Sequence, residues 1–286
     1  MQPEKTNVMN ISVSHIRRAL QECYSAQEAA NLSRIICCEM LGQTAVDYYL
    51  GKDMILSSKE KQELDSILAR LRDFEPIQYI QRSARFLERS YYVAPGVLIP
   101  RPETEELVET MLKEVPPGAR ILDIGTGSGC IAVSLSKAFP AASVDAWDVS
   151  EEALVIARRN NDMLGGNVRF FRRNVLTYEP DGGERYEAIV SNPPYVMESE
   201  RKEMERNVLD WEPPTALFVS DDDPLLFYRR IAELGRTMLV PGGRLYFEIN
   251  RACGEATVAM LGRLGYTRPL VLKDISGNNR IVIAER

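Results

Sequence analysis

Hydrophobic residues in roughly the first eighty positions recur at intervals of three and four, the spacing of helices that bury one face. Ser25 and Glu28 have the spacing of a capping box, in which the two side chains satisfy free backbone N–H groups of the first turn. Ser57 and Glu60 repeat it. The apolar positions downstream are Leu32, Ile35, Ile36, Cys38, Met40 and Leu41, then Leu64, Ile67, Leu68 and Leu71. We interpret them as core and predict a small helical-bundle domain over residues 1–83.

The pattern changes after Glu75-Pro76. Residues 84–97 contain short aromatic and β-branched stretches and a Pro95-Gly96 turn, which predict a β-hairpin linker. Beyond residue 98, apolar segments of strand length alternate with amphipathic segments of helix length. The first helix is predicted over 105–114, and its apolar side consists of Leu107, Val108, Met111 and Leu112.

The rest of the chain predicts seven strands, at 120–124, 143–148, 168–172, 187–191, 244–249, 269–273 and 280–284. Further helices are predicted at 130–139, 151–162, 225–239 and 254–264. Strands that alternate with helices form a mostly parallel sheet with helices on both faces. The expected fold class is therefore α/β, with a Rossmann-like seven-stranded sheet in a domain of residues 98–286.

Composition and charge narrow the function classes. The chain has 286 residues, of which 45% are hydrophobic and 27% charged, as in ordinary globular proteins. No apolar run is long enough to cross a bilayer, and the polar stretch 1–10 lacks the apolar core of a signal peptide, so we expect a cytoplasmic protein. The net charge is -6, and the longest basic clusters are pairs such as Arg172-Arg173, which argues against direct binding of nucleic acid.

Cysteine and histidine usage argues against metal and nucleophile chemistry. The five cysteines are odd in number and form no CxxC pair, which argues against a disulfide framework or a thiolate zinc site. The single histidine, His15, lies in a predicted helix, where a surface or packing role is the simpler interpretation. We therefore predict neither a metal site nor a histidine-based catalytic triad.

A glycine-rich loop lies between the predicted strand 120–124 and the helix that follows. Its residues are Asp123, Ile124, Gly125, Thr126, Gly127, Ser128 and Gly129. Glycines permit backbone angles that side chains forbid and let a ligand approach the main chain. The GxGxG spacing is one residue shorter than the GxGxxG of dinucleotide-binding loops, and a tight turn without a ligand has the same pattern. Alone, the loop is a weak signal.

Three polar residues near the loop make it a more specific signal for a cofactor site. Asp148 ends the next predicted strand, where an acidic residue accepts hydrogen bonds from ribose hydroxyls, although a solvated strand end is the alternative interpretation. Asp123, at the lip of the loop, adds negative charge that suits a cofactor with a sulfonium and an ammonium group. A phosphate-binding loop would instead supply a lysine. Asn174 follows the third predicted strand, where it is placed to bond an adenine edge.

The segment Asn192-Pro193-Pro194-Tyr195 follows the predicted strand 187–191, at the edge where open α/β sheets bind ligands. Prolines lack an N–H donor, so their carbonyls act only as acceptors. An asparagine oxygen and a proline carbonyl can accept both N–H bonds of an NH2 group and hold its weakly nucleophilic nitrogen in line with a methyl group. Tyr195 can stack on the planar group that carries this nitrogen. A Pro-rich turn without function is the alternative.

Together, the glycine loop, Asp148 and the tetrapeptide resemble those of class I S-adenosylmethionine-dependent methyltransferases. The segment 98–105, Leu-Ile-Pro-Arg-Pro-Glu-Thr-Glu, narrows the resemblance to the peptide chain release factor glutamine methyltransferase family, PrmC/HemK. The resemblance covers nearly the whole chain, including residues 75–80 and Glu212-Pro213. It implies methylation of the side-chain amide nitrogen of the glutamine in the Gly-Gly-Gln loop of bacterial release factors, with the N-terminal domain gripping the factor.

The resemblance also assigns residues by matching positions. It implies that S-adenosylmethionine is bound by Gly125, Thr126, Gly127, Ser128, Gly129, Asp148 and Asn192. From their position after the third predicted strand, we also expect Asn174 and Val175 to contact this cofactor. It implies that residues 101–104 line the site near the cofactor, and that the substrate glutamine is bound by Arg101, Glu103, Asn192, Pro193, Pro194 and Tyr195. Of these, Asn192, Pro193 and Tyr195 are the expected catalytic residues. We expect a monomer whose partner is a release factor.

The chain departs from the family pattern at four positions. Asn174 and Val175 stand where an acidic and often a bulky residue are expected, and Gln81 and Asn250 replace glycines.

Three alternative functions stay open. An adenine-N6 nucleic-acid methyltransferase uses the same amine geometry on a flipped base but would need a basic groove. A dinucleotide-dependent oxidoreductase leaves the tetrapeptide unexplained, and a cofactor-binding protein without catalysis is disfavoured by the intact motifs.

Overall fold

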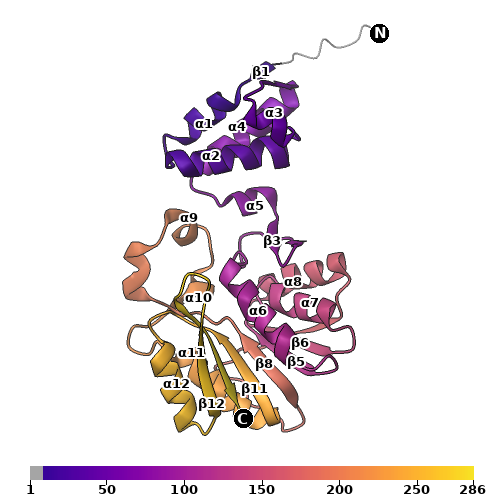
Figure 1. Ribbon diagram of the computed structural model, residues 1–286, viewed down its shortest axis with the longest axis vertical. Coiled ribbons are helices and arrows are strands. Elements are labelled where there is room, and N and C mark those ends of the chain that lie inside the picture. The colour runs from indigo at the N-terminus through magenta and orange to yellow at the C-terminus, as the bar shows by residue number, and fades with distance from the viewer. Residues whose placement is uncertain (1–8) are drawn as a thin grey trace. The chain divides into compact units, whose positions relative to one another are not determined.

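The computed structural model describes residues 9–286 and divides the described chain into two units (Figure 1). We call them the helical unit, which comprises residues 9–81 with Arg206–Trp211, and the sheet unit, which comprises Arg82–Glu205 and Glu212–Arg286. Residues 1–8, which make up most of the polar N-terminal stretch and the start of the predicted first domain, lie outside the described residues.

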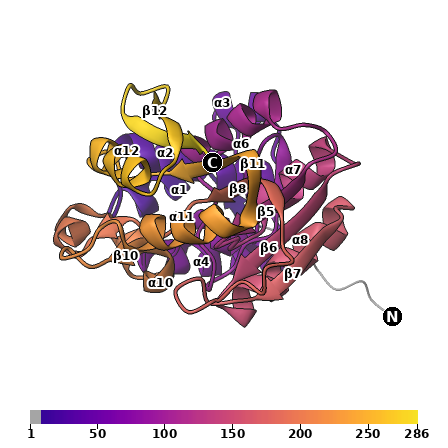
Figure 2. The same ribbon diagram turned by 90° about the horizontal axis from the view of Figure 1, so that it is seen from below.

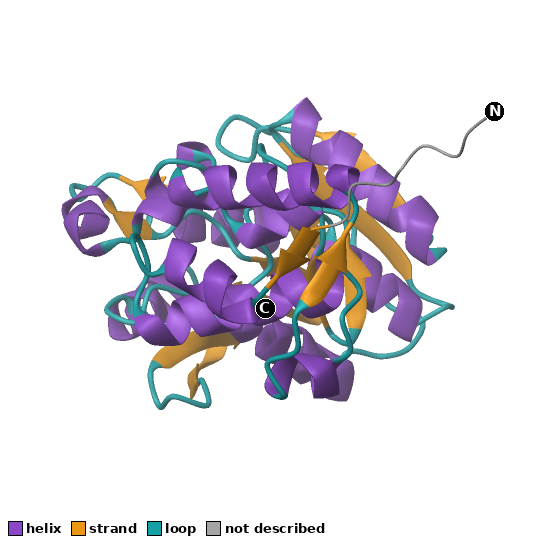
Figure 3. Ribbon diagram, turned by 90° about the horizontal axis from the view of Figure 1, so that it is seen from above, coloured by secondary structure: helices purple, strands orange, loops and turns teal. Residues whose placement is uncertain are grey.

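Helices, purple in Figure 3, make up most of the helical unit, whose N-terminal part is drawn in indigo to purple in Figure 1. Its elements are β1 (Met9–Ile11), α1 (Val13–Leu20), α2 (Ala26–Arg34), the π-helical turn η1 (Ile35–Met40), α3 (Ala45–Tyr49), β2 (Met54–Leu56), α4 (Ser58–Arg72) and α5 (Ile77–Gln81). The capping box predicted at α4 is present: Ser57 Oγ accepts from the Glu60 N–H, and the Glu60 carboxylate accepts from the Ser57 N–H over 2.8 Å. The predicted apolar face of α4 is buried at Leu64, Ile67, Leu68 and Leu71. The helical bundle is thus confirmed, with a short antiparallel β1–β2 pair that the pattern does not predict.

A segment from the middle of the chain completes the helical unit. It contains α9 (Arg206–Leu209) and ends at Trp211. The Trp211 indole donates to the carbonyl of Asp73 over 3.0 Å, and the Arg206 guanidinium lies 4.2 Å from the centre of the Phe74 ring. These contacts hold the segment against the chain that follows α4.

A seven-stranded sheet forms the centre of the sheet unit. Its strands are β5 (Arg120–Ile124), β6 (Ser143–Asp148), β7 (Val168–Arg172), β8 (Tyr186–Ser191), β11 (Leu239–Glu248), β12 (Thr267–Lys273) and β13 (Asn279–Glu285). Their order is β12-β13-β11-β8-β5-β6-β7, and every pairing is parallel except those of β13. All seven strands were predicted, and so was the mostly parallel sheet.

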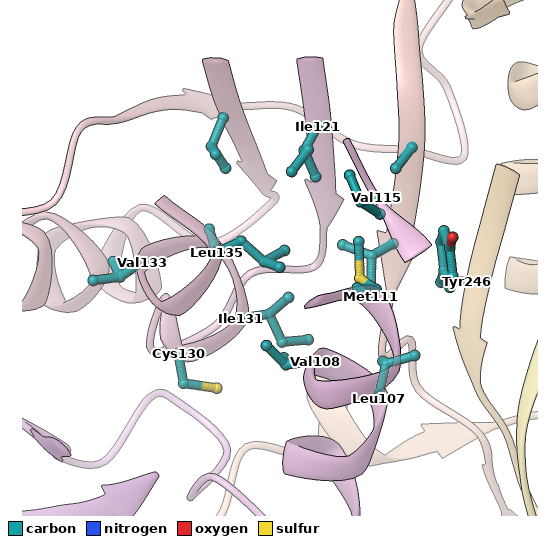
Figure 4. Close-up of a cluster of buried hydrophobic side chains, with 14 of the residues drawn as sticks. Leu107, Val108, Met111, Val115, Ile121, Cys130, Ile131, Val133, Leu135 and Tyr246 are labelled. Atoms are coloured by element: carbon teal, nitrogen blue, oxygen red, sulfur yellow. The ribbon is translucent and has the colours of Figure 1, made fainter. Parts of the chain in front are cut away.

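Helices cover both faces of this sheet (Figure 2). One face carries α6 (Pro102–Glu114), α7 (Cys130–Ala138) and α8 (Glu151–Leu164), and the other carries α11 (Leu226–Met238) and α12 (Gly254–Arg263). Successive residues of a strand point to opposite faces of the sheet. In β5, Ile121 and Leu122 accordingly belong to different apolar clusters, one on each face. In the first cluster, Leu107 of α6 and Ile131 of α7 pack over β5 and Tyr246 of β11 (Figure 4).

The predicted hairpin is present as β3 (Ala84–Phe86) and β4 (Arg89–Tyr91), and it packs as part of the sheet unit. Its turn lies at Leu87-Glu88, whose φ angles are 46° and 61°. The predicted Pro95-Gly96 turn is also present, after the hairpin, where the Val97 N–H donates to the Ala94 carbonyl over 3.4 Å. The sequence pattern missed the Leu87-Glu88 turn because neither residue favours a positive φ. Tertiary contacts hold it instead: the Leu87 N–H donates to the Glu105 carboxylate over 3.1 Å, and Phe86 is buried.

The segment between β8 and α11 has short elements that the sequence pattern did not predict. They are β9 (Val196–Met197), the 3-10 turn η2 (Glu198–Glu203), α9, α10 (Pro214–Leu217) and β10 (Phe218–Val219), and β9 pairs with β10 in parallel. Elements this short have too few positions to establish a period.

Among residues 9–286, no helix combines the length and apolar composition that a membrane span requires.

We expect Leu107→Ala to lower the free energy of unfolding of the sheet unit by about 2–5 kcal/mol, because it leaves a void between α6, α7 and the sheet. Val155→Ala on α8 is the control, since its side chain is 58% exposed; its effect should stay within about 0.5 kcal/mol. Urea unfolding followed by Trp147 fluorescence, in a Trp211→Phe background that leaves one tryptophan, measures both. Equal losses in the two variants would contradict the assignment of Leu107 to the core.

Candidate functional site

A cavity of about 520 Å³ opens in the sheet unit where β5, β6, β7 and β8 end at their carboxyl edges. Of the predicted site residues, those that line it are Arg101, Gly125, Thr126, Gly127, Ser128, Asp148, Asn174, Val175, Asn192, Pro193 and Pro194. Glu103, Gly129 and Tyr195 lie outside this lining. The structure thus brings the glycine loop, the strand-end acids and most of the tetrapeptide to one cavity, at the edge where α/β sheets bind ligands.

The glycine loop presents bare backbone to this cavity. Gly125 and Gly127 have φ angles of 76° and 54°, which favour glycine. A Cβ at Gly127 would meet no atom within 4 Å, and one at Gly125 would meet only the Asn192 carbonyl oxygen at 4.0 Å. Gly129 serves a different purpose, because a Cβ there would lie 3.1 Å from the Ala157 Cβ on α8. Its lack of a side chain lets α7 approach α8.

Asp148 holds the loop in this shape. One carboxylate oxygen accepts from the Gly127 N–H and the other from the Ser150 N–H, each over 2.9 Å. Burial raises the pKa of Asp148, while these backbone donors oppose the rise. The residue therefore presents a half-buried, hydrogen-bonded carboxylate at the end of β6, beside the cavity.

Asp123 lies beneath the loop and not at its lip, which corrects the sequence-based expectation. Its side chain is completely buried, and one oxygen accepts from the Thr126 hydroxyl over 2.7 Å. The other oxygen, Oδ1, has no hydrogen-bond partner among the described residues. Burial raises the pKa of Asp123 to about 7, against the effect of the Thr126 hydroxyl, and the negative charge of Asp148 adds to the rise. The strand-end position of Asp123 suggested exposure, but the loop folds over it.

The cavity wall after β7 contains Arg173, Asn174 and Val175. Asn174 Oδ1 accepts from the Leu176 N–H over 3.0 Å, so this side chain also shapes the turn. Arg173 was not predicted as a site residue. Its guanidinium lies 4.5 Å from the ring centres of Trp147 and Tyr178 and pairs with Glu184 over 2.5 Å. This packing makes Arg173 a fixed part of the wall, which its position in a basic pair did not reveal.

The tetrapeptide splits between the cavity and the core. Asn192, Pro193 and Pro194 line the cavity, and Asn192 Nδ2 donates to the Thr104 hydroxyl over 3.3 Å. Tyr195 turns away, because its hydroxyl donates to Glu248 over 2.9 Å and its ring packs against the α11 and α12 core. Glu248 also accepts from Thr104 over 2.6 Å. The sequence motifs assign no role to Glu248, which lies at the end of a strand in the last third of the chain.

The segment that leads into α6 is anchored by a buried acid. Arg101 lines the cavity and forms an ion pair of 2.5 Å with Glu212. Glu212 is 3% exposed and also accepts from the Ile99 N–H over 3.0 Å. Glu103 is half-buried in the first turn of α6, outside the lining. Arg101 therefore reaches the cavity with its charge already paired.

The segment after the tetrapeptide is held by Asn250, one of the departures from the family pattern. Its side-chain NH2 donates to the Tyr195 carbonyl over 3.1 Å and to the Glu200 carboxylate over 2.8 Å. Glu200 also accepts from the Met197 N–H over 2.8 Å. A glycine could make none of these side-chain bonds. Asn250 thus fixes the path of the chain that leaves the tetrapeptide.

These features define the chemistry that the cavity can support. Bare backbone at two glycines accommodates a ligand in close contact. The half-buried carboxylate of Asp148 and the buried carboxyl group of Asp123 beneath the loop favour a ligand that carries positive charge. Among the residues described, no three His, Cys, Asp or Glu side chains are arranged to hold a metal ion. The cavity volume falls within the range of small-molecule cofactor sites.

Two family models match the chain. The Methyltransferase small domain matches residues 102–210, and the PrmC N-terminal domain matches residues 13–81. Curated relatives extend the similarity along the chain. A release factor glutamine methyltransferase of Bacteroides thetaiotaomicron is 56% identical over 278 residues, which is 97% of this chain and 100% of that protein. The protein of the same name from Flavobacterium psychrophilum is 42% identical and covers 93% of this chain and 94% of its own length.

Solved structures share the fold at low identity. A methyltransferase from Pyrococcus furiosus superposes with a TM-score of 0.52 at 19% identity, over 77% of this chain and 98% of its own. A 16S rRNA N2 G1207 methyltransferase from T. thermophilus, in complex with AdoMet and guanosine, gives a TM-score of 0.52 at 18% identity, over 71% of this chain and 49% of its own. At these identities the similarity concerns the fold alone.

Asp123 should make the stability of the sheet unit depend on pH. Because its folded pKa is raised to about 7, its contribution to stability is fully present below about pH 4 and is lost as the pH rises through about 7. Between about pH 5 and about pH 8, the free energy of unfolding should fall more in the parent protein than in Asp123→Asn, which mimics the protonated acid. The difference should be on the order of 3 kcal/mol. Urea unfolding followed by Trp147 fluorescence in the Trp211→Phe background tests this. Parallel pH profiles for the two proteins would refute it.

Proposed function

Because the chain belongs to the release factor glutamine methyltransferase family, we propose that it transfers a methyl group from S-adenosylmethionine to the side-chain amide nitrogen of a glutamine in the Gly-Gly-Gln motif of a release factor. The observation that carries this proposal is the position of Asn192 and Pro193. They line the same cavity as the glycine loop and Asp148, at the carboxyl ends of adjacent strands.

The cavity fits S-adenosylmethionine, which when bound supplies an electrophilic methyl group on a sulfonium. The backbone of Gly125 and Gly127 is open to a ligand, and the acids near the loop suit its positive charges. We assign its binding to Gly125, Thr126, Gly127, Ser128, Asp148, Asn174, Val175 and Asn192. Gly129 contributes by letting α7 pack against α8, which keeps the loop in place.

The substrate amide needs two acceptors, and the tetrapeptide offers them. We assign one N–H of the glutamine amide to Asn192 Oδ1 and the other to the Pro193 carbonyl. Held in this way, the nitrogen is oriented for attack, and positive charge developing on it is stabilised. The methylated nitrogen then loses a proton to water, so the proposal requires no general base. Tyr195 takes a supporting role, since its hydroxyl is bonded to buried Glu248.

The remaining assignments concern the edges of the site and the partner. Arg101 borders the place proposed for the glutamine. Glu103 lies outside the cavity lining, and its negative charge raises the pKa of Glu248. We retain the domain limits 1–83, 84–97 and 98–286 as proposals and assign the docking of the release factor to the first domain. We further propose that the protein acts as a monomer in the cytoplasm, where release factors work, without binding nucleic acid directly.

We expect label from methyl-labelled S-adenosylmethionine to pass to a release factor that carries Gly-Gly-Gln. The same factor with this glutamine replaced by glutamate should take up none, because a carboxylate offers no NH2 group to the two acceptors. Incubation with DNA tests the adenine-N6 alternative. Label on DNA, or equal label on the glutamine and glutamate forms of the factor, would overturn the proposal.

Asn192→Ala should lower kcat by about 100-fold or more, because it removes one of the two acceptors that orient the amide. Binding of S-adenosylmethionine, measured by calorimetry, should weaken but stay detectable. Asn167→Ala is the matched control, since Asn167 is exposed in the loop before β7. Full activity in Asn192→Ala would rule out the role given to this residue.

A further inference from the structure

A chain of hydrogen bonds leads from the tetrapeptide into the core of the sheet unit. Asn192 Nδ2 donates to Thr104 Oγ1 over 3.3 Å, and Thr104 Oγ1 donates to Glu248 Oε2 over 2.6 Å. The Tyr195 hydroxyl donates to the other oxygen, Glu248 Oε1, over 2.9 Å. These hydrogen bonds therefore link the first turn of α6, the end of β11 and both ends of the tetrapeptide.

The direction of each hydrogen bond follows from the chemistry of the groups. An ionised carboxylate only accepts, so Thr104 must give its one hydroxyl proton to Glu248. The Thr104 oxygen then has only lone pairs to offer to Asn192, which must turn its NH2 group toward it. The other end of the carboxamide, Asn192 Oδ1, is left for a ligand in the cavity.

Burial makes this arrangement rigid. Thr104 is 3% exposed and Glu248 is 1% exposed, so water is not at hand to replace a broken bond. Burial raises the pKa of Glu248, but the hydroxyls of Thr104 and Tyr195 and the charge of Arg280 act in the opposite direction and favour the ionised form. Both hydroxyls bond to Glu248 in the directions that an ionised carboxylate demands.

We propose that Thr104 and Glu248 are positioning residues that hold the carboxamide of Asn192 with its oxygen toward the substrate NH2 group. The inference rests on the proposed function, in which this oxygen accepts an N–H of the glutamine amide. A reversed carboxamide would set one NH2 group against another, and neither could accept. Glu248 acts only through its hydrogen-bonded neighbours, and through them it controls the orientation of the Asn192 carboxamide.

Three substitutions separate orientation from general stability. Thr104→Val removes the hydroxyl at nearly constant volume, and Thr104→Ser keeps it as the matched control. Glu248→Gln introduces an NH2 group that can donate to Thr104, which frees the Thr104 proton to bond Asn192 Oδ1 and reverse the carboxamide. The double variant Thr104→Val with Glu248→Gln tests whether the two residues act through one chain of bonds.

With the full chain, S-adenosylmethionine and a Gly-Gly-Gln release factor, Thr104→Val and Glu248→Gln should each lower kcat by on the order of 10- to 100-fold. The Kd for S-adenosylmethionine should change by less than about threefold in each variant, and Thr104→Ser should stay within about threefold of the parent kcat. The double variant should lose no more than Thr104→Val alone. Equal losses in the Ser and Val variants, or an unchanged kcat in Glu248→Gln, would overturn the inference.

An NMR measurement distinguishes failure of this inference from failure of the proposed function. The side-chain NH2 signal of Asn192, identified by its loss in Asn192→Ala, should show a nuclear Overhauser effect to the Thr104 methyl group. This effect should disappear in Glu248→Gln. That result supports the positioning role of Thr104 and Glu248 even if no methyl group reaches the release factor. In that case the proposed function alone fails. Absence of the effect in the unmodified protein overturns the positioning role.

Discussion

The parallel pairing of β5 with β8 sets Ile124 opposite Ser191, and the Ser191 hydroxyl donates to the Ile124 carbonyl over 2.7 Å. Both strands end at this pair, so the glycine loop and the tetrapeptide begin side by side. The backbone oxygen of Asn192 lies 4.0 Å from the point where a Cβ of Gly125 would stand. A slip of one residue would turn every side chain of a strand to the opposite face. The whole cavity depends on this register.

Buried and half-buried carboxyl groups then hold the pieces of the cavity in place. Asp148 fixes the Gly127 backbone, Glu248 fixes Thr104, and Glu212 fixes the approach to α6. Burying a carboxyl group costs free energy, which appears as the raised pKa of Asp148 and of Glu248. Each group offsets that cost with two hydrogen bonds to donors around the cavity. The acids around this site therefore act largely on the protein's own chain.

Much of the fold followed from local pattern because the elements are long and periodic. The seven strands and the helices α4, α6, α7, α8, α11 and α12 all lie where apolar spacing predicts them. The turn at Leu87-Glu88 was missed, because its positive φ angles are imposed by Glu105 and by packing and not by the turn residues. The elements between β8 and α11 were missed because they are too short to show a period.

The sequence by itself determined the order of the long strands and helices of the sheet unit, the chemistry proposed for the tetrapeptide and the family, because these depend on residue type and on spacing along the chain. Only the tertiary structure decided that Asp123 lies under the loop, that Tyr195 turns into the core and that Glu248 supports Thr104. Thr104 and Glu248 are 144 residues apart in the chain. A hydrogen bond over such a separation leaves no local pattern, because it depends on which strand ends and helix starts the folded sheet brings together.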